Sequence, residues 1–481
     1  MNIQNGDSAI FYFKEISRIP RETAKEKQIS DYLVDFAKKR NLEVRQDELF
    51  NVVIKKKSNI KNFKGSAVIL QGHMDMVYVK DVDSRQVYEN GLELVEKDGC
   101  FYANKTSLGA DNGIAVAYML AILDTDKIKH PDLEMIFTVQ EEAGMVGVQH
   151  FNTDDIKGKY FINFDTEEEG VLFTGCAGGV RNYLHLPAKR EKIEAEKLLS
   201  VKISGLKSGH SGMEIHMGRG NGIKLMGRLL HRINSDGIHL CSIIGLGKAN
   251  VISNNCEVLI AVSNNAKNNI INEIIESEKI FKKELQFTDN IHIDITEQDN
   301  MKNDVDVLTE ETKNKLIDLL MVIPCGVITI SHAIDNLVQT SMNVGSIEEK
   351  DNKISVLSFI RSSVESEKHY VSDIVRTIAA AYKAECIFFN DYPEWEYKAE
   401  SKLRDVAVEA FEEINHRTPA ITAVHAGLEC GYFNKKLKDV DMISFGPDQY
   451  DVHTTNEHIN IESIRSVWRL TVRLLEKLAY M

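Results

Sequence analysis

Apolar and polar positions follow two periods along the first ~185 residues. Residues 9–17 and 24–39 space their apolar side chains as amphipathic helices do, and residues 110–123 are apolar over the length of a helix. Short apolar runs of strand length lie at 66–70, 133–139 and 160–164. This alternation of strands and helices predicts an α/β domain built on a largely parallel, buried sheet.

From about residue 190 the order of elements changes to that of an α+β domain. Two similar series follow one another, which indicates two related halves in one wide antiparallel sheet, a doubled ferredoxin-like arrangement. The predicted strands are 201–204, 238–244, 256–262, 292–296 and 386–389, the predicted helices are 221–233, 268–284, 310–320 and 372–383, and a hairpin covers 338–360.

After residue 395 the α/β pattern returns, with a helix from residue 401, a strand at 441–445 and a closing helix at 461–480. We therefore predict one α/β domain in two parts, residues 1–189 and 395–481. An α+β insertion of residues 190–394 interrupts it.

The composition excludes several classes of protein. A formal net charge of −14 repels phosphate backbones and anionic lipids, so we expect neither a nucleic acid nor a membrane as partner. The seven cysteines are scattered without a CxxC pair, which argues against a disulfide framework and a thiolate zinc site. Together with the lack of a signal-peptide pattern at the N-terminus, this predicts a cytoplasmic protein.

Four apolar segments carry or end in side chains that can bind a metal. These are His73 and Asp75, Asp111, the pair Glu141 and Glu142, and Asp165. Singly, such residues are more often helix caps, solvated carboxylates or packed histidines. Three of the four groups follow predicted strands and the fourth opens a helix, so we expect the carboxyl ends of the strands to bring them together.

The ligand types indicate the chemistry. Imidazole and carboxylate suit Zn²⁺, Mn²⁺ or Co²⁺, and a carboxylate such as Asp111 can bridge two ions about 3.5–4 Å apart. A further carboxylate beside the ions can take the proton of a water and pass it to a leaving amine, which is amide hydrolysis.

Six ordered motifs resemble those of a known enzyme family. They are GHMDMV, LGADNGIAVA, TVQEEAGMVG, INFDTEEEG, GHSGMEI and DVHTTNE. The chain is similar over nearly its whole length to the co-catalytic zinc peptidases of the carnosinase and glutamate-carboxypeptidase type. Within them it most resembles the aminoacyl-histidine (Xaa-His) dipeptidases.

The resemblance implies a set of metal ligands and a parallel-sheet catalytic domain interrupted by a lid. His73 and Asp165 would hold one zinc ion, Glu142 and His453 the other, and Asp111 would bridge them. Glu141 would be the general base acting on a water between the ions, and Asp75 would orient His73. The resemblance also implies a cis peptide bond between Asp111 and Asn112.

Further motifs lie in or after the insertion. By resemblance, His210 stabilises the oxyanion, Asn250 and Arg361 hold the substrate carboxylate, and Gly427 offers backbone to the substrate. Residues 250–256 read Asn-Val-Ile-Ser-Asn-Asn-Cys in place of the usual N-A-I-P-R-E run, which leaves the substrate preference open. We assign no catalytic role to His425 or Glu429, and we interpret the glycine-rich residues 174–179 as a turn.

The preferred function is hydrolysis of short peptides, Xaa-His dipeptides first, with two divalent ions, preferably Zn²⁺. The alternatives are a tripeptidase, an aminopeptidase, an N-acyl amino acid deacylase, or a peptide-binding relative without activity. A homodimer is compatible with the sequence, and so is His210 acting on the active site of its own chain or of a partner.

Overall fold

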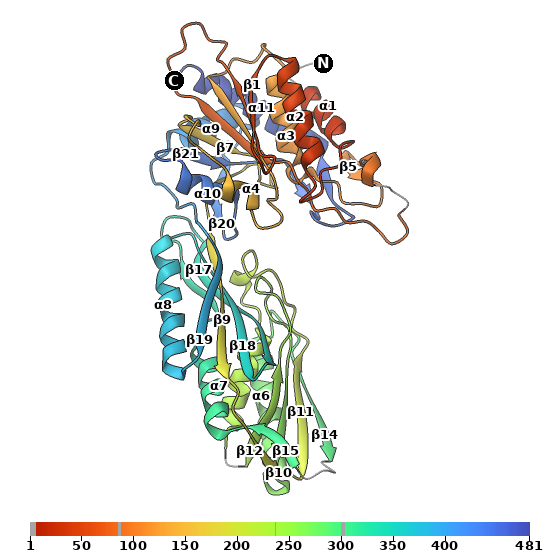
Figure 1. The fold of residues 1–481 in the computed structure, drawn as a ribbon, viewed down its shortest axis with the longest axis vertical. Coiled ribbons are helices and arrows are strands. Elements are labelled where there is room, and N and C mark those ends of the chain that lie inside the picture. The colour runs from red at the N-terminus through yellow and green to blue at the C-terminus, as the bar shows by residue number, and fades with distance from the viewer. Residues whose placement is uncertain (1–5, 85–87, 236, 300–303) are drawn as a thin grey trace. The chain divides into compact units, whose positions relative to one another are not determined.

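The structure is a computed structural model that describes residues 6–84, 88–235, 237–299 and 304–481 (Figure 1). The chain forms two compact units. Unit 1 comprises Met1–Cys176, Trp395–Ala423 and Leu428–Met481, and unit 2 comprises Ala177–Glu394 and Val424–Gly427.

Unit 1 is built on an eight-stranded sheet in the order β1-β2-β6-β3-β7-β21-β8-β20. Its centre is parallel, since β3 pairs in parallel with β6 and β7, and β21 pairs in parallel with β7. The strands are β1 (Glu43–Gln46), β2 (Val52–Lys56), β3 (Val68–His73), β6 (Leu133–Thr138), β7 (Tyr160–Asn163), β8 (Val171–Cys176), β20 (Ala420–Val424) and β21 (Asp441–Ser444).

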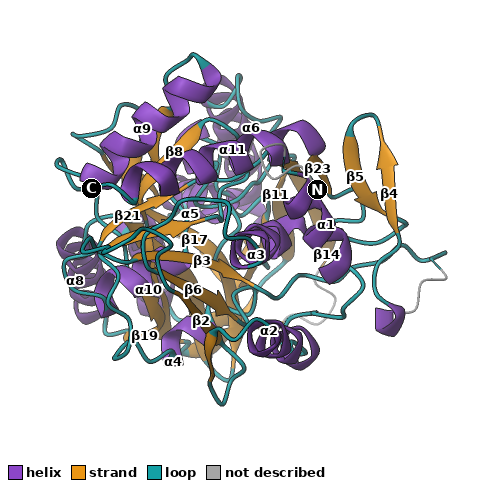
Figure 2. Ribbon diagram, turned by 90° about the horizontal axis from the view of Figure 1, so that it is seen from above, coloured by secondary structure: helices purple, strands orange, loops and turns teal. Residues whose placement is uncertain are grey.

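Helices cover both faces of this sheet, as the alternation along β7 shows. Ile162 joins the main core of unit 1, whereas the ring of the preceding Phe161 lies 5.0 Å from that of Phe433 in α10. The helices α9 and α11 lie side by side (Figure 2). The helices are α1 (Asp7–Ile16), α2 (Lys27–Lys39), α3 (Ala110–Leu123), α4 (Val146–His150), α9 (Lys402–Asn415), α10 (Glu429–Lys436) and α11 (Ile461–Leu478).

A small antiparallel sheet joins two distant parts of unit 1. It consists of β4 (Leu94–Lys97), β5 (Cys100–Ala103), β22 (Gln449–Tyr450) and β23 (His458–Asn460), with β23 paired to β5. The loop between β22 and β23 contains His453, so this sheet carries a late segment of the chain to the early one.

Unit 2 is α+β, as the sequence predicted for this region, and apart from the two-stranded pair β10-β15 it contains two antiparallel sheets. The first has the order β12-β13-β11-β14 and the second β16-β17-β18-β9-β19. The strands are β9 (Gly178–Pro187), β10 (Arg190–Glu194), β11 (Lys197–Ser204), β12 (Ile238–Ile244), β13 (Cys256–Val262), β14 (His292–Asp299), β15 (Asp304–Leu308), β16 (Gly326–Ile330), β17 (Val338–Lys350), β18 (Lys353–Ser362) and β19 (Glu385–Tyr392).

Each sheet of unit 2 follows the βαββαβ order of a ferredoxin-like half. The first half runs β11-α5-β12-β13-α6-β14, and the second runs β9-α7-β17-β18-α8-β19 with the first half inserted after β9. The helices are α5 (Gly222–Ile233), α6 (Asn264–Glu284), α7 (Glu310–Val322) and α8 (Glu365–Tyr382). The halves are therefore nested in the chain and do not simply follow each other.

The two sheets meet at one isolated bridge, in which Gly245 and Ile347 exchange two backbone hydrogen bonds of 2.8 Å. The expected single wide sheet is thus two sheets that are joined by this bridge and contribute to one hydrophobic core.

Two expectations for the region around residue 180 need correction. We placed the first boundary after residue 189, but β9 pairs with β18 and β19, so unit 2 begins at Ala177. Residues 174–179 do not form a turn, because Thr174–Cys176 end β8 and Gly178 begins β9.

None of the helices in the described part of the chain has the length and apolar character needed to cross a bilayer. All seven cysteines are described, and none of them forms a disulfide.

Candidate metal centre and substrate-binding residues

The parallel strands of unit 1 deliver the predicted metal-binding residues to one edge of the sheet. His73 ends β3 opposite Thr138 of β6, and Glu141 and Glu142 follow shortly after Thr138. Asp165 comes two residues after the end of β7, which pairs with β3 on its other side. Asp111 lies in the first turn of α3.

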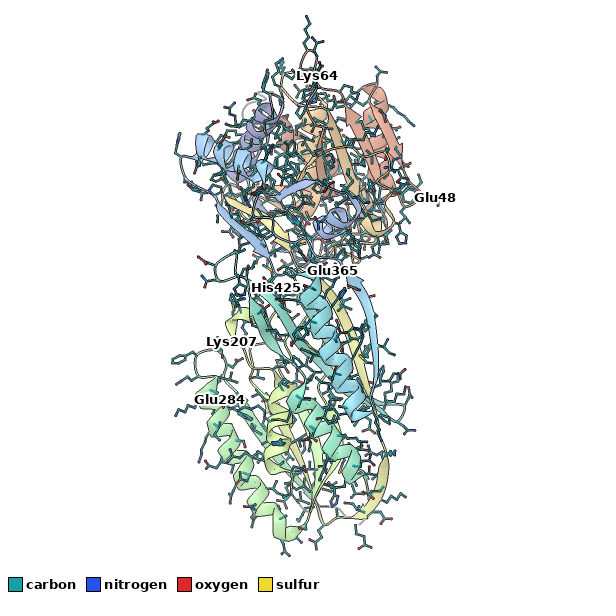
Figure 3. All side chains as sticks on the ribbon, turned by 90° about the vertical axis from the view of Figure 1, so that its left-hand side faces the viewer. Glu48, Lys64, Lys207, Glu284, Glu365 and His425 are labelled. Carbon is teal, nitrogen blue, oxygen red and sulfur yellow. The ribbon has the colours of Figure 1, made fainter. Side chains whose placement is uncertain are left out.

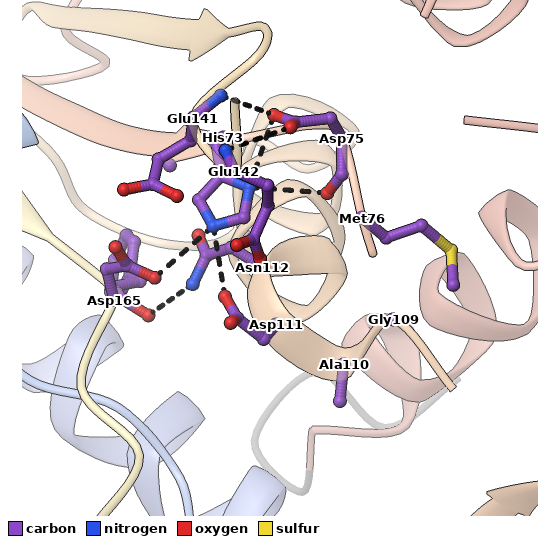
Figure 4. Close-up of polar contacts among 12 residues, drawn as sticks. His73, Asp75, Met76, Gly109, Ala110, Asp111, Asn112, Glu141, Glu142 and Asp165 are labelled. Carbon is purple, nitrogen blue, oxygen red and sulfur yellow. Dashed lines mark hydrogen bonds and ion pairs between the residues drawn. The ribbon is translucent and has the colours of Figure 1, made fainter. Parts of the chain in front are cut away.

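Asp111 lies between the two histidines. Its Oδ1 is 3.0 Å from His73 Nε2 and its Oδ2 is 3.2 Å from His453 Nε2. His73 Nε2 is also 3.5 Å from Asp165 Oδ1 (Figure 4), and His453 Nε2 is 2.7 Å from Glu142 Oε1. Four residues from distant parts of the chain thus gather around the carboxylate of Asp111.

Asp75 lies behind this group and orients it. His73 Nδ1 is 3.2 Å from the carbonyl oxygen of Asp75 and 3.4 Å from its Oδ1. The same carboxylate accepts hydrogen bonds from the backbone N–H groups of Glu141 and Glu142, at 3.1 and 3.3 Å (Figure 4). Asp75 therefore connects the end of β3 to the loop after β6.

Several carboxylates and two imidazoles lie close together here, and they shift one another's pKa values. Hydrogen bonds with Asp111 and Glu142 raise the pKa of His453 to about 11. Burial disfavours the charged forms of His73 and Asp111, but their neighbours outweigh it. Asp165 and Asp111 raise the pKa of His73, and His453 and His73 lower that of Asp111. Burial raises the pKa of Glu141 well above its ordinary value.

The donor set fits divalent cations. One atom each of His73, Asp111 and Glu142 lies within 4.8 Å of the others, a spacing suited to one ion. His73 Nδ1 faces Asp75, which leaves Nε2 as the ligand atom, and both histidine Nε2 atoms face the same carboxylate. Imidazole nitrogen with carboxylate oxygen is a typical combination for Zn²⁺ and its neighbours. The peptide bond between Asp111 and Asn112 is cis, as the resemblance implied.

In unit 2, His210 and Arg361 form a second group of predicted residues. Arg361 on β18 is 5% exposed, its Nη1 donates to Tyr392 Oη at 2.9 Å, and its Nη2 is 3.4 Å from His210 Nε2. His210 Nδ1 accepts hydrogen bonds from the backbone N–H groups of Gly212 and Met213, at 3.3 and 3.0 Å. Burial and the charge of Arg361 lower the pKa of His210 to about 4, and the two N–H donors at Nδ1 favour the neutral tautomer with the proton on Nε2.

His425 belongs to the same group, although its motif alone assigned it no role. Its Nε2 lies 2.7 Å from Ser341 Oγ, and burial together with Arg361 lowers its pKa to about 3. Figure 3 labels His425 at the end of unit 2 where α8 begins at Glu365.

The other two predicted substrate-binding residues, Asn250 and Gly427, also belong to unit 2. The carbonyl of Asn250 accepts from the N–H of Ser211, so Asn250 adjoins the His210 loop through its backbone. Gly427 is the last residue of the short segment Val424–Gly427 that belongs to unit 2.

Two buried charged residues near the candidate metal centre, Arg21 and Glu457, were missed, and a third, Glu429, was named without a role. Arg21 and Glu457 hydrogen-bond to backbone groups of the loops that carry His73 and Asp111, and Glu429 accepts from Gln71 and Thr138. Glu457 stands in the motif DVHTTNE, which we used only for His453, and Arg21 lies between the two helices predicted at residues 9–17 and 24–39.

Comparison with protein families decides what kind of protein carries these residues. Residues 69–477 match the model of peptidase family M20/M25/M40. The chain belongs to this family. The expectation of an enzyme that hydrolyses peptides is thereby confirmed.

Two relatives of this M20 peptidase resemble it over nearly the whole chain. The cytosol non-specific dipeptidase of Escherichia coli (strain K12) is 33% identical, with 97% of this chain and 96% of the relative covered. The crystal structure of an aminoacylhistidine dipeptidase from Vibrio alginolyticus has a TM-score of 0.91 at 32% identity, covering 98% and 96% of the two chains. The aminopeptidase PepT from Bacillus cereus ATCC 10987, at 16% identity and a TM-score of 0.57, covers 99% of this chain and 100% of its own and shares the fold.

Proposed function

We propose that this M20 peptidase hydrolyses dipeptides, Xaa-His dipeptides among them, with two divalent cations in unit 1. The two relatives that cover nearly the whole chain are named as dipeptidases, one non-specific and one for aminoacylhistidine substrates. The observation that carries the proposal is the position of Asp111, whose two carboxylate oxygens each face a histidine from a different end of the chain.

The contacts favour one assignment of ligands. His73 and Asp165 hold the first ion, Glu142 and His453 hold the second, and Asp111 bridges them. We prefer Zn²⁺, with Mn²⁺ and Co²⁺ as alternatives, because the ligands are imidazoles and carboxylates. When bound, such a pair of ions lowers the pKa of a water and polarises the substrate carbonyl.

Glu141 is the proposed general base. No described residue hydrogen-bonds to its carboxylate, whereas its backbone N–H is fixed by Asp75 beside the ligands. A carboxylate without a partner at this position can accept a proton from water and deliver it to the nitrogen of the leaving amine.

Unit 2 supplies the groups that we assign to the rest of the substrate. His210 carries its proton on Nε2 and is neutral, which suits a hydrogen bond to an oxyanion. The buried guanidinium of Arg361 has no carboxylate partner among the described residues, so it suits the terminal carboxylate of a dipeptide. Asn250 and Gly427 are assigned to substrate binding by resemblance.

Removal of metal tests the function. Protein treated with EDTA should lose hydrolysis of a dipeptide such as carnosine and regain it with Zn²⁺, Mn²⁺ or Co²⁺, as measured by release of the free amino acid. Full activity of the metal-free protein would refute the proposal.

A substrate panel separates the alternatives. We expect hydrolysis of Xaa-His and other dipeptides, and rates at least about tenfold lower for tripeptides, because the two relatives that cover nearly the whole chain are named as dipeptidases. Preference for N-acyl amino acids over dipeptides would favour a deacylase.

Two further proposals concern the setting of the enzyme. A cytoplasmic location is supported by the name of the Escherichia coli relative. A homodimer remains a proposal that sedimentation would test.

A further inference from the structure

Two charged side chains from opposite ends of the sequence hydrogen-bond to the backbone of one residue, Gly109, beside the candidate metal centre. Arg21 and Glu457 are 1% and 2% exposed, respectively. Arg21 donates from Nη2 to the carbonyl of Gly109, and Glu457 accepts from the N–H of the same residue at 3.0 Å. Gly109 and Ala110 lead directly into Asp111 (Figure 4).

Glu457 serves as the cap of α3. Its carboxylate accepts the N–H groups of Leu108, Gly109 and Ala110 at 2.8, 3.0 and 2.8 Å. The residue at the N-cap position is Gly109, with φ of 66°, and it has no side chain to cap the helix. A carboxylate from another part of the chain therefore satisfies the amides of this turn.

Arg21 joins this turn to the end of β3. Besides the Gly109 carbonyl, its Nη1 donates to the carbonyls of Met74 at 3.2 Å and Asp75 at 3.3 Å. The turn at Gly109 has no space for a larger side chain, since a Cβ at this position would lie 2.6 Å from Arg21 Nη2 and 2.5 Å from Met76 Sδ. The guanidinium thus spans the loop that follows His73 and the loop that precedes Asp111.

We infer that Arg21 and Glu457 are positioning residues that set the bridging Asp111 relative to both histidines. Arg21 fixes the Asp111 turn against the loop after His73, and Glu457 fixes the same turn against its own loop, four residues after His453. Both side chains hydrogen-bond to backbone groups of these loops. The inference rests on the metal site proposed above.

A buried glutamate elsewhere in unit 1 provides a matched control. Glu134 on β6 is 5% exposed, and its carboxylate accepts the backbone N–H groups of Lys157 and Gly158 at 2.9 and 2.8 Å. It performs the same kind of bonding as Glu457, but the loop that it holds carries none of the proposed ligands.

The test compares Glu457→Gln with Glu134→Gln. Each substitution keeps the size of the side chain and removes a carboxylate that binds backbone amides. We measure the affinity for Zn²⁺ by competition with a chromophoric chelator, and the visible absorption spectrum of the Co²⁺-loaded protein. We expect Glu457→Gln to bind Zn²⁺ about 10–100-fold more weakly and to shift the Co²⁺ spectrum, because residues behind metal ligands have effects of this size.

Glu134→Gln should lower the thermal midpoint yet leave both metal measurements unchanged. Wild-type Zn²⁺ affinity and an unchanged Co²⁺ spectrum in Glu457→Gln would overturn the inference, and so would an equal loss of affinity in Glu134→Gln. If Glu457→Gln does not fold, Arg21→Lys decides in its place, since it keeps the charge but not the planar fork. We then expect Arg21→Lys to bind Zn²⁺ more weakly than the wild type, and wild-type affinity in this variant would overturn the inference.

These measurements need no turnover. A wild-type protein that binds Co²⁺ but hydrolyses no peptide would therefore contradict the proposed function alone, and the comparison of affinities would still decide the inference.

Discussion

Glu141 and Glu142 are neighbours in the sequence, but their carboxylates have different surroundings. Glu142 Oε1 lies 2.7 Å from His453 Nε2, whereas no described residue hydrogen-bonds to the Glu141 carboxylate. Because Asp75 accepts the backbone N–H groups of both residues, the loop holds them in fixed but distinct orientations. The surroundings of Glu141 suit proton transfer, and those of Glu142 suit metal binding.

The substitution Glu141→Gln should lower kcat for a dipeptide by about 10³-fold, because the amide cannot accept the proton of a water. The metal content, measured by elemental analysis, should stay at the wild-type value. Glu168→Gln, in an exposed carboxylate of the separate acidic run at residues 167–169, should be as active as the wild type. Normal turnover by Glu141→Gln would show that another group is the base.

His425 predicts a pH dependence of stability in unit 2. Burial, the guanidinium of Arg361 and the nearby His210 and His216 lower its pKa to about 3. In the unfolded chain its pKa is about 6.5, so below that pH the unfolded state binds a proton that the folded state does not. Stability is therefore complete above about pH 6.5 and falls as the pH is lowered.

At pH 5 the expected loss from His425 is about 2 kcal/mol relative to pH 7. Denaturant unfolding of the wild type and of His425→Gln at both pH values measures it. The variant keeps a polar side chain near Ser341 and should lose less stability between pH 7 and pH 5. Equal losses in the two proteins would show that His425 does not contribute.

The two missed positioning residues have a common physical reason. A buried arginine or glutamate that bonds to backbone groups leaves no pattern in the sequence, because its partners are peptide groups that every residue has. Metal ligands are easier to predict, since their side-chain types are uncommon at strand ends and recur in ordered motifs.

Among the elements, α3 has bounds that the local sequence predicts and an apolar surface that its tertiary packing explains. The apolar run predicted a helix over residues 110–123, and α3 has these bounds. Its apolar character on all sides is explained by burial, since every residue of the helix except Asp111 is buried. The approach of α3 to β3 is so close that Gly72 faces Ala115 and Asn112 directly.

Gly72→Ala should therefore separate α3 from β3. The added methyl group would overlap Ala115 Cβ and Asn112 Oδ1, which we expect to cost about 1–3 kcal/mol of stability. Since Asn112 follows Asp111 and Gly72 precedes His73, Zn²⁺ affinity should fall as well. Thermal unfolding and metal titration measure the two effects, and an unchanged variant would mean that α3 moves freely.

β9 was the main element that the sequence analysis missed. Its partners are β18 and β19, which follow in the chain only after the whole first half of unit 2. A pairing over such a distance is not visible in local periodicity, and the glycines at its start resemble a turn. By contrast, β12 and β13 match their predicted bounds, since their apolar runs are flanked by polar residues.

The whole molecule consists of two units, each with its own hydrophobic core. The chain leaves unit 1 at Cys176 and returns at Trp395, and these two residues exchange backbone hydrogen bonds of 2.9 and 3.1 Å. The ends of the large insertion are thus adjacent in unit 1.

Deletion of residues 177–394, with a short glycine-serine linker from Cys176 to Trp395, should leave a folded unit 1. We expect cooperative thermal unfolding and a Co²⁺ absorption spectrum like that of the full chain, because the proposed ligands all lie in unit 1. Dipeptide hydrolysis should be lost, because His210 and Arg361 are removed. An aggregated product without Co²⁺ binding would show that unit 1 depends on unit 2.

The sequence by itself determined the α/β and α+β classes and most helices, and it supplied the residues that we propose as metal ligands. These depend on local periodicity and on uncommon side chains in ordered motifs, both of which are present in the chain before it folds. Tertiary structure alone decided the nested halves of unit 2, the boundary at Ala177 and the hold of Arg21 and Glu457 on Gly109. These depend on pairings between residues far apart in the chain and on backbone groups, which carry no signal in the order of side chains.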